Sequence, residues 1–271
     1  MRSPNTIRTA FIGAMAVVVC AVLPVHAQVD VDLELVLAVD VSGSMDIGEA
    51  ELQRNGYVDA FRHPDVIRAI ETGLHGRIAV SYVEWAGTQH QALVVPWRIV
   101  ADADSADVFA RDINRLPIRR HFGTSISSAL EFAAAQFAQS GARGFRRAID
   151  VSGDGPNNMG PPVVEARDAL VRKGIAINGL PVMIREGIAA GRARIPNLDV
   201  YFEDCVIGGP GAFIVPVRDR DGFGQAIRRK LVLEIAGLPP RVMQVAESVA
   251  GSRVDCMIGE KNRGNWILND P

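Results

Sequence analysis

The sequence predicts an α/β protein with a doubly wound, mostly parallel sheet, one antiparallel edge strand and a C-terminal extension. Short β-prone apolar runs alternate with helical patterns along most of the chain. The run 33–39 is almost continuously apolar, as expected of a central parallel strand covered on both faces. The strand-like runs 77–84 and 92–97 are joined by a short turn containing Gly87, which indicates a hairpin and hence an antiparallel edge strand.

The remaining elements follow from periodicity and turn residues. In chain order we predict helices at 47–61, 105–115 and 125–138, a strand at 148–152, a helix at 163–172, a strand at 175–180, a helix at 198–205, a last strand at 212–217 and a terminal helix at 221–235. Residues 182–196 are predicted to be an insertion, and Gly208-Gly209 is expected to stop the preceding helix in the left-handed conformation.

The N-terminal segment, residues 1–27, is predicted to be a secretory signal peptide. Arg2 and Arg8 precede an uncharged apolar run over 10–25, and Ala27 provides a small residue at the cleavage position. The alternative, a membrane anchor, is less favoured because the apolar run is shorter than the roughly 20 residues of a spanning helix. Cleavage leaves no predicted transmembrane segment, so we expect a periplasmic or secreted protein.

The predicted mature chain of 244 residues suits one α/β domain at 28–237 with a C-terminal extension at 238–271. Once the two signal arginines are removed, 27 basic residues stand against 31 acidic ones. A mildly acidic chain gives no indication of nucleic-acid binding. We therefore expect no nucleic acid among its partners.

Two of the three cysteines lie in the predicted mature chain. In an oxidising compartment Cys205 and Cys256 are expected to form one disulfide. The alternative is a pair of separately buried thiols. Cys20 lies within the signal, where Val19 disfavours a lipid-attachment site because that position needs a small residue.

The first polar cluster follows the central strand directly, in Asp40-Val41-Ser42-Gly43-Ser44. Side chains at the carboxyl ends of parallel strands enter the crevice where such sheets bind ligands. Carboxylate and hydroxyl oxygens are the ligands that a hard cation such as Mg²⁺ prefers. Taken alone, the pattern also fits a simple turn in which Asp40 caps the next helix.

Two further residues favour a cation site. Thr124 stands at the start of the predicted helix 125–138, and Asp154 follows the predicted strand 148–152. Both positions fall at the edge of the sheet where Asp40 lies. A helix cap at Thr124 and a turn at Asp154 are the structural alternatives, but their joint occurrence in this order favours one shared site.

These five residues resemble the metal-ion-dependent adhesion site (MIDAS) of von Willebrand factor A domains, whose pattern is DxSxS, then a Thr, then an Asp. The resemblance covers 32–237 and extends to a bacterial exported branch of undefined function, on the strength of the Ser-Gly-Asp-Gly-Pro-Asn-Asn run and the Cys-Val-Ile-Gly-Gly-Pro-Gly-Ala-Phe run. The family usually has Thr or Ser directly before the last acid, whereas this chain has Gly153 there.

The resemblance implies a role for each site residue. Ser42 and Ser44 would bind the cation directly, Thr124 directly or through water, and Asp40 and Asp154 largely through waters. The cation would be Mg²⁺, with Mn²⁺ or Ca²⁺ as alternatives. It would keep an open position for a carboxylate of a partner protein, so the resemblance implies a binding module and not an enzyme.

The competing hypothesis is a metal-assisted hydrolase or phosphoryl-transfer enzyme, because Mg²⁺ at the edge of an α/β sheet also serves that chemistry. The sequence has no GxSxG, P-loop or Asp-x-Asp motif, although Glu84, Asp150 and His121 are conceivable acid-base residues. A third possibility is a structural subunit of an envelope complex. Metal binding distinguishes this possibility from the metal-dependent binding module.

Overall fold

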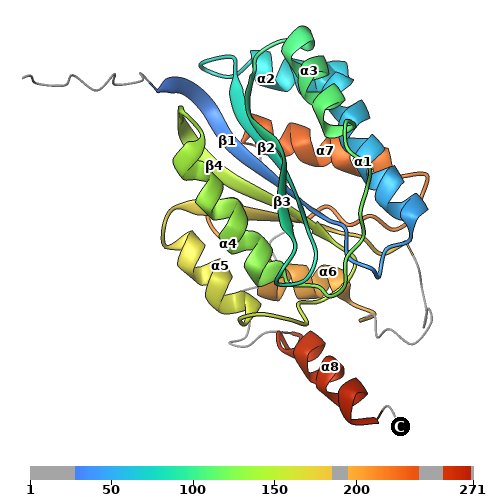
Figure 1. Ribbon diagram of the computed structural model, residues 1–271. Coiled ribbons are helices and arrows are strands. Elements are labelled where there is room, and N and C mark those ends of the chain that lie inside the picture. Colours follow the sequence, from blue (N-terminus) through green and yellow to red (C-terminus); the bar gives the residue numbers. More distant parts are fainter. Residues whose placement is uncertain (1–27, 185–194, 238–252, 270–271) are drawn as a thin grey trace, which may run out of the picture.

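One five-stranded sheet forms the centre of the protein (Figure 1). The computed structural model describes residues 28–184, 195–237 and 253–269; the predicted signal peptide and most of the predicted insertion lie outside them. The strands are β1 (Val29–Asp40), β2 (Ile78–Trp85), β3 (Gln91–Val100), β4 (Ala142–Gly153) and β5 (Ile175–Pro181), in the spatial order β3-β2-β1-β4-β5.

The strand directions confirm the predicted fold class. The central strand β1 runs parallel to β2 and β4, and β5 runs parallel to β4, whereas the edge strand β3 is antiparallel to β2. Asp40 pairs with Trp85 at the end of the β1–β2 ladder, and Ala38 pairs with Val151 on β4. The register therefore brings the carboxyl ends of β1 and β4 to the same edge of the sheet.

Helices cover both faces of the sheet. One face carries α1 (Ile47–Arg62), α2 (Pro64–Glu71), α3 (Ala103–Ile113) and α7 (Phe223–Ala236), and the other carries α4 (Ile126–Gln136), α5 (Val163–Val171) and α6 (Leu198–Tyr201). The first layer packs around Tyr57, Phe61 and Phe109, and the second around Leu130 and Tyr201. No described helix is both long and apolar enough to cross a membrane.

The segment after α6 differs from its prediction. The helix continues as a π-helix at Phe202–Val206 and ends there, because Ile207 is extended and its N–H donates to the carbonyl of Phe202. The expected stop at Gly208-Gly209 is therefore wrong. Gly209 does adopt a positive φ of 92°, but it lies beyond the helix end.

The predicted last strand at 212–217 lies parallel to β5 but forms only isolated bridges, Gly179 with Ile214 and Val182 with Val217. The ladder is interrupted at Pro181, which has no N–H to donate at the position between the two bridges. A proline in the partner strand, rather than the composition of 212–217, thus prevents a continuous sixth strand.

Two helices were not predicted. Pro64 biases His63 toward an extended conformation, which ends α1 at Arg62, and the same proline starts α2. The second, α8 (Ile258–Asn269), lies within the predicted C-terminal extension, whose polar composition gave no helical signal.

A buried ionic cluster joins β4 to α7. Lys230 Nζ lies 2.6 Å from Asp150 Oδ1 and 2.7 Å from Glu234 Oε1, and Asn178 Nδ2 donates to Glu234 at 2.8 Å. Burial, together with the nearby Asp150 charge, raises the pKa of Glu234 to about 7. The ammonium group of Lys230 is therefore the shared counter-charge of two acids that are removed from water.

Replacing Lys230 with Met leaves Asp150 buried without its cation, so we expect Lys230→Met to lower the free energy of unfolding by about 3–5 kcal/mol. Urea denaturation measures the effect. The exposed Lys173 provides the control, because Lys173→Met should change stability little. Equal stability of the wild type and Lys230→Met would contradict a structural role for the ion cluster.

Candidate metal site

The turn after β1 folds around the carboxylate of Asp40. Asp40 Oδ1 accepts a 2.6 Å hydrogen bond from the N–H of Ser42, and Gln53 Nε2 donates to the carbonyl of Asp40 at 2.9 Å. The helix α1 is capped by Asp46, in a capping box with Glu49. The alternative in which Asp40 caps that helix is therefore wrong, and its carboxylate lies at the edge of the sheet.

Hydroxyl groups connect this turn to the end of β4. The Oγ atoms of Ser42 and Ser44 are 2.8 Å apart and share a hydrogen bond, and Ser44 Oγ donates to Asp154 Oδ1 at 2.6 Å. The N–H of Asp154 donates to Asp40 Oδ2 at 3.4 Å. Four of the five predicted residues thus form one hydrogen-bonded group.

Gly153 occupies the position that departs from the family pattern. A Cβ built there would lie 3.4 Å from Asp40 Oδ2 and within 3.6 Å of the rings of Trp85 and Phe202. These are ordinary van der Waals distances for a Cβ, and Gly153 is not among the glycines with a positive φ, so the structure gives no steric reason for glycine at this position. Asp154 follows it directly.

The fifth predicted residue, Thr124, is buried on a neighbouring loop. Backbone hydrogen bonds hold that loop against the turn after β1: Gly43 N–H donates to the carbonyl of His121 at 2.7 Å, and His121 N–H donates to the carbonyl of Val41 at 3.1 Å. The cap of α4 is Ser125, so the alternative role of Thr124 as a helix cap is wrong. The backbone hydrogen bonds of its loop therefore hold Thr124 beside the turn after β1.

Asn158, a residue without a predicted role, links Thr124 to the loop that carries Asp154. Its Oδ1 accepts from the N–H of Thr124 at 3.0 Å, and its own N–H donates to the carbonyl of Thr124 at 2.9 Å. The adjacent Gly123 has a φ of 86°, and a Cβ there would lie 2.1 Å from Met159 Sδ. In the sequence, the Pro-Asn-Asn run at 156–158 is the feature that marks the contact between Asn158 and Thr124.

The electrostatics of the group favour a cation. Burial and the nearby charge of Asp154 raise the pKa of Asp40 to about 8, against the lowering effect of hydrogen bonds from Ser42 and the Asp154 backbone. Two acids thus face each other where the ionised form of one is disfavoured. A divalent cation placed between them would remove that cost.

The donor set fits a hard cation. It consists of carboxylate and hydroxyl oxygens, which suit Mg²⁺, Mn²⁺ or Ca²⁺ better than softer metals. Within 28–184, 195–237 and 253–269 there is no cluster of three or more His, Cys, Asp or Glu residues with the geometry of a metal site. A cation here would depend on the serine and threonine hydroxyls.

A cavity of about 380 Å³ adjoins the turn after β1. Stacked imidazoles of His90 and His121, with ring centroids 3.7 Å apart, form part of its wall. Burial raises the pKa of Glu84, which also lines the cavity, and an ion pair with Arg54 opposes that rise. Arg119 and Leu116 line it as well.

The conceivable acid-base residues have other partners. Glu84 pairs with Arg54, and Asp150 pairs with Lys230. His121 lies beside the turn after β1, and burial together with neighbouring His90 lowers its pKa. His121 and Glu84 both line the cavity beside the turn after β1, whereas Asp150 lies in the ion cluster with Lys230.

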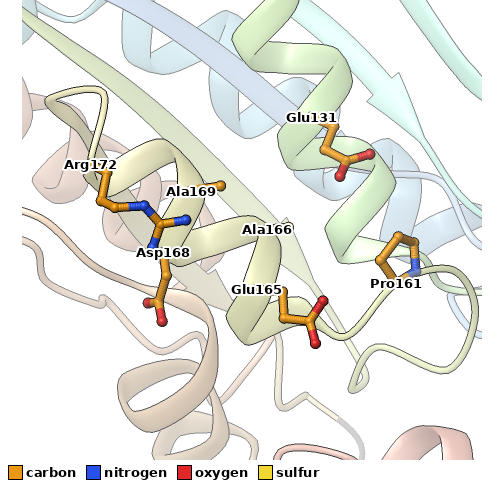
Figure 2. A pocket seen from close by; sticks show the side chains of 7 residues that line it. All are labelled: Glu131, Pro161, Glu165, Ala166, Asp168, Ala169 and Arg172. Atoms are coloured by element: carbon orange, nitrogen blue, oxygen red, sulfur yellow. The ribbon is translucent and has the colours of Figure 1, made fainter.

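An open hollow of about 480 Å³ lies elsewhere, between α4 and α5 (Figure 2). Glu131, Glu165, Asp168 and Arg172 are among the residues that line it. It shares no residue with the Asp40 group, and its acidic side chains lie at the outer surface. It does not contribute to the candidate metal site.

Comparison with known families identifies the family of the chain. The model of the family described as "Protein of unknown function (DUF1194)" matches residues 30–239. The chain belongs to this family. No curated protein matches it in sequence.

Solved structures share the fold. Proximal thread matrix protein 1 from the mussel byssus, with a zinc-occupied MIDAS motif, is 14% identical with a TM-score of 0.53, over 76% of this chain and 46% of that chain. A von Willebrand factor type A structure from Catenulispora acidiphila is 14% identical with a TM-score of 0.53, over 76% and 43%. The pilus adhesin SpaC from Lactobacillus rhamnosus GG is 11% identical with a TM-score of 0.55, over 76% and 31%.

These similarities confirm the resemblance at the level of fold: the chain has the fold of a von Willebrand factor A domain. It spans less than half the length of each of the three chains. Identities this low establish the fold but assign no activity, which has to be argued from the site residues.

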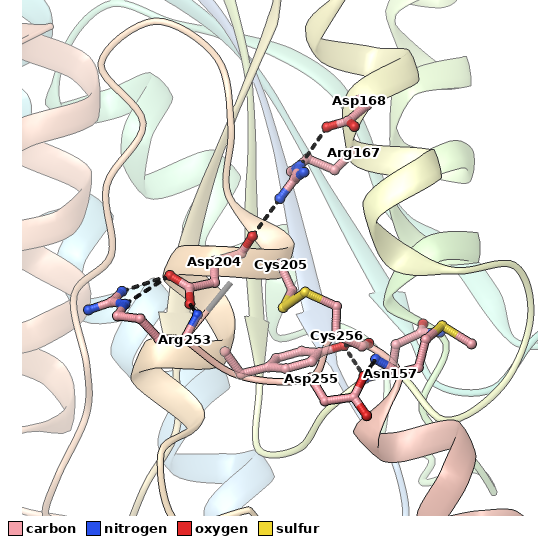
Figure 3. Close-up of a disulfide and its surroundings, with 10 residues drawn as sticks. Asn157, Arg167, Asp168, Asp204, Cys205, Arg253, Asp255 and Cys256 are labelled. Carbon is pink, nitrogen blue, oxygen red and sulfur yellow. Dashed lines mark hydrogen bonds and ion pairs between the residues drawn. A yellow bond between two sulfur atoms is a disulfide. The ribbon is translucent and has the colours of Figure 1, made fainter. Parts of the chain in front are cut away.

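The predicted disulfide is confirmed. Cys205, in the π-helix, is bonded to Cys256, which precedes α8, with their Cα atoms 5.5 Å apart (Figure 3). Around it, Arg253 makes ion pairs with Asp204 and Glu203. The disulfide therefore fastens the start of α8 to the domain.

Closing a loop between residues 51 positions apart restricts the unfolded chain. We expect the double variant Cys205→Ser/Cys256→Ser to lose about 2–4 kcal/mol of unfolding free energy. Urea denaturation measures the loss, and alkylation of unreduced protein followed by intact-mass analysis checks the bond. Two labelled thiols in the mature wild-type chain would contradict the disulfide.

Proposed function

We propose that the protein is an exported, metal-ion-dependent binding module that coordinates a divalent cation, Mg²⁺ in the first place, and engages a carboxylate of a partner protein. The observation that carries this proposal is the hydrogen-bonded group of Asp40, Ser42, Ser44 and Asp154 at the carboxyl edge of the sheet. Mn²⁺ and Ca²⁺ are the alternative ions for an oxygen-only donor set.

In this proposal the five residues have different roles toward the ion. Ser42 and Ser44 bind the ion directly, Thr124 binds it directly or through water, and Asp40 and Asp154 hold coordinated waters. When bound, the ion supplies a Lewis acid that attracts an anionic oxygen. Because the hydroxyl ligands are neutral, they neutralise none of its charge, and it retains affinity for an acidic side chain of the partner.

The surface near the site suits a protein partner. Phe122, next to His121 in the loop that carries Thr124, is 73% exposed; Leu116, in the loop after α3, and Ile47, the first residue of α1, are 54% and 48% exposed. Large exposed apolar side chains grouped near a polar site are typical of contact surfaces. Arg119 lies in the same loop as Leu116 and would attract an acidic partner.

Binding is favoured over catalysis because Glu84 and Asp150, two of the conceivable acid-base residues, are engaged in ion pairs. Two solved structures of this fold carry names of adhesive or matrix proteins, the pilus adhesin SpaC and the thread matrix protein of the mussel byssus. Those names support the proposal by analogy only.

Export to the periplasm or the outside of the cell is part of the proposal. It is supported by the signal-like segment at 1–27 and by the Cys205–Cys256 disulfide, which is typical of oxidising compartments.

Mg²⁺ should raise the melting temperature of the wild type in a concentration-dependent way, because it binds the folded state. Asp40→Ala removes a carboxylate that faces the ion and should abolish this shift. Differential scanning fluorimetry in EDTA and in increasing Mg²⁺ measures it. Asp59→Ala, which removes an exposed carboxylate from α1, is the matched control and should respond like the wild type.

Retention of the full Mg²⁺ response in Asp40→Ala would refute the assignment of the site. No Mg²⁺ response in the wild type would favour the structural-subunit hypothesis. Metal-dependent hydrolysis of p-nitrophenyl phosphate or p-nitrophenyl acetate by the wild type, lost in Asp40→Ala, would instead favour the enzyme hypothesis.

Partner binding should follow the metal. Immobilised wild-type protein should retain a specific protein from envelope extract in Mg²⁺ and release it in EDTA, because the ion is the group that the partner's carboxylate contacts. Ser42→Ala/Ser44→Ala should retain none, and Asp59→Ala should retain it as the wild type does. Equal retention in Mg²⁺ and EDTA would contradict the metal-dependent mode.

A further inference from the structure

The C-terminal helix α8 lies directly on the loop that carries Asp154. A Cβ built at Gly259, near the start of α8, would lie 2.1 Å from the carbonyl oxygen of Asn157. The helix therefore approaches the loop backbone at a distance that only glycine permits. One residue further on, Glu260 Oε1 accepts a 2.7 Å hydrogen bond from Asn157 Nδ2.

Asn157 is fully buried and connects α8 with two other elements. Its Oδ1 accepts from the N–H of Ser127 on α4 at 3.1 Å, and its own N–H donates to the hydroxyl oxygen of Tyr201 on α6 at 3.1 Å. One side chain thus uses its carbonyl oxygen for α4 and its amide group for Glu260. A buried amide satisfied on all sides has little freedom to move.

The neighbouring Asn158 extends these contacts to the metal site. Its side chain and backbone hold Thr124, as described above, and its carbonyl accepts from Arg263 Nη1 on α8 at 3.4 Å. The residues between Asp154 and Asn158 form no regular secondary structure. Contacts from outside the loop must therefore fix its path.

The disulfide fastens this helix to the domain. Cys256 lies two residues before α8, and its carbonyl accepts a 3.5 Å hydrogen bond from the hydroxyl of Tyr201 (Figure 3). Val254 and Ile258 on either side pack against the apolar core between the sheet and α4–α6. The start of α8 is thus held covalently and by packing.

We propose that α8 is a disulfide-anchored strap that positions the 154–158 loop, and with it Asp154 and Thr124, for cation binding. The inference rests on the proposed function for its metal readout. Gly259 and Glu260 are the positioning residues, acting through Asn157, and the Cys205–Cys256 bond holds the helix in place. Breaking the bond lowers the affinity of the site for the ion.

Groups that orient metal ligands from outside typically affect metal affinity by about 10- to 100-fold. We expect Gly259→Ala to weaken Mg²⁺ binding about tenfold, at the lower end of that range, because its methyl group pushes α8 away from Asn157. Glu260→Ala and Cys205→Ser/Cys256→Ser should act in the same direction. Isothermal titration of full-length exported protein with MgCl₂ alone, well below the melting temperature, measures the affinity.

The matched control is Lys261→Ala. Lys261 lies on the same helix beside Glu260, and its ammonium group pairs with the exposed Asp255 rather than with the loop. This variant should bind Mg²⁺ as the wild type does. A loss equal to that of Gly259→Ala would mean that any change in α8 disturbs the protein, and would overturn the specific role of the Asn157 contact.

A second readout needs no metal. In EDTA, hydrogen exchange of the backbone amides of Asn157, Asn158 and Thr124 should be faster in Gly259→Ala and Glu260→Ala than in the wild type and Lys261→Ala, because the loop loses its support. Unchanged exchange at these amides together with unchanged Mg²⁺ affinity would overturn the strap.

The two readouts separate this inference from the proposed function. If the wild type binds no Mg²⁺ but the variants still exchange faster, α8 orders the loop and the metal proposal is wrong. If the wild type binds Mg²⁺ and all α8 variants bind it equally, the metal proposal stands and the strap is overturned.

Discussion

The repulsion between the buried carboxylates of Asp40 and Asp154 is the constraint around which this edge of the sheet is arranged. Parallel pairing of β1 with β4 brings the two strand ends together, and burial raises the pKa of Asp40 to about 8. Hydrogen bonds from Ser42 and Ser44 offset part of the cost. Ionisation of both acids is therefore disfavoured at this buried position, and a bound cation would remove that cost.

A second pair of buried acids shows the alternative solution. Asp150 and Glu234 lie on β4 and α7, and Lys230, 1% exposed, supplies their counter-charge from within the chain. At the Asp40 site, hydroxyl groups and backbone N–H groups of the described residues donate hydrogen bonds that orient the carboxylate oxygens. Strand β4 thus carries the carboxylate of Asp150, which has a cation within the chain, and is followed directly by Asp154, whose carboxylate we propose faces an external ion.

The sequence predicted the fold class, the central position of β1 and the antiparallel edge strand, because apolar periodicity is a pattern of neighbouring residues. It predicted the disulfide from the number of cysteines and the expected oxidising compartment. It also named the four residues that the structure joins by hydrogen bonds. It did not predict α8, whose position depends on a disulfide and on Asn157, or the interruption of the last strand by Pro181. Such features arise from contacts between segments distant in the chain, which local patterns do not contain.

The most direct test of a cation between these residues is a crystal structure of the exported protein grown in Mn²⁺, with data collected at the manganese absorption edge. The account predicts one anomalous peak at about 2.1–2.2 Å from Ser42 Oγ and Ser44 Oγ, with Asp40 and Asp154 on coordinated waters, near the distances of hard-cation ligands. Asp40→Ala crystals grown under the same conditions should lack the peak. A wild-type map without a peak at Ser42 and Ser44, or with one only at other residues, would contradict the account.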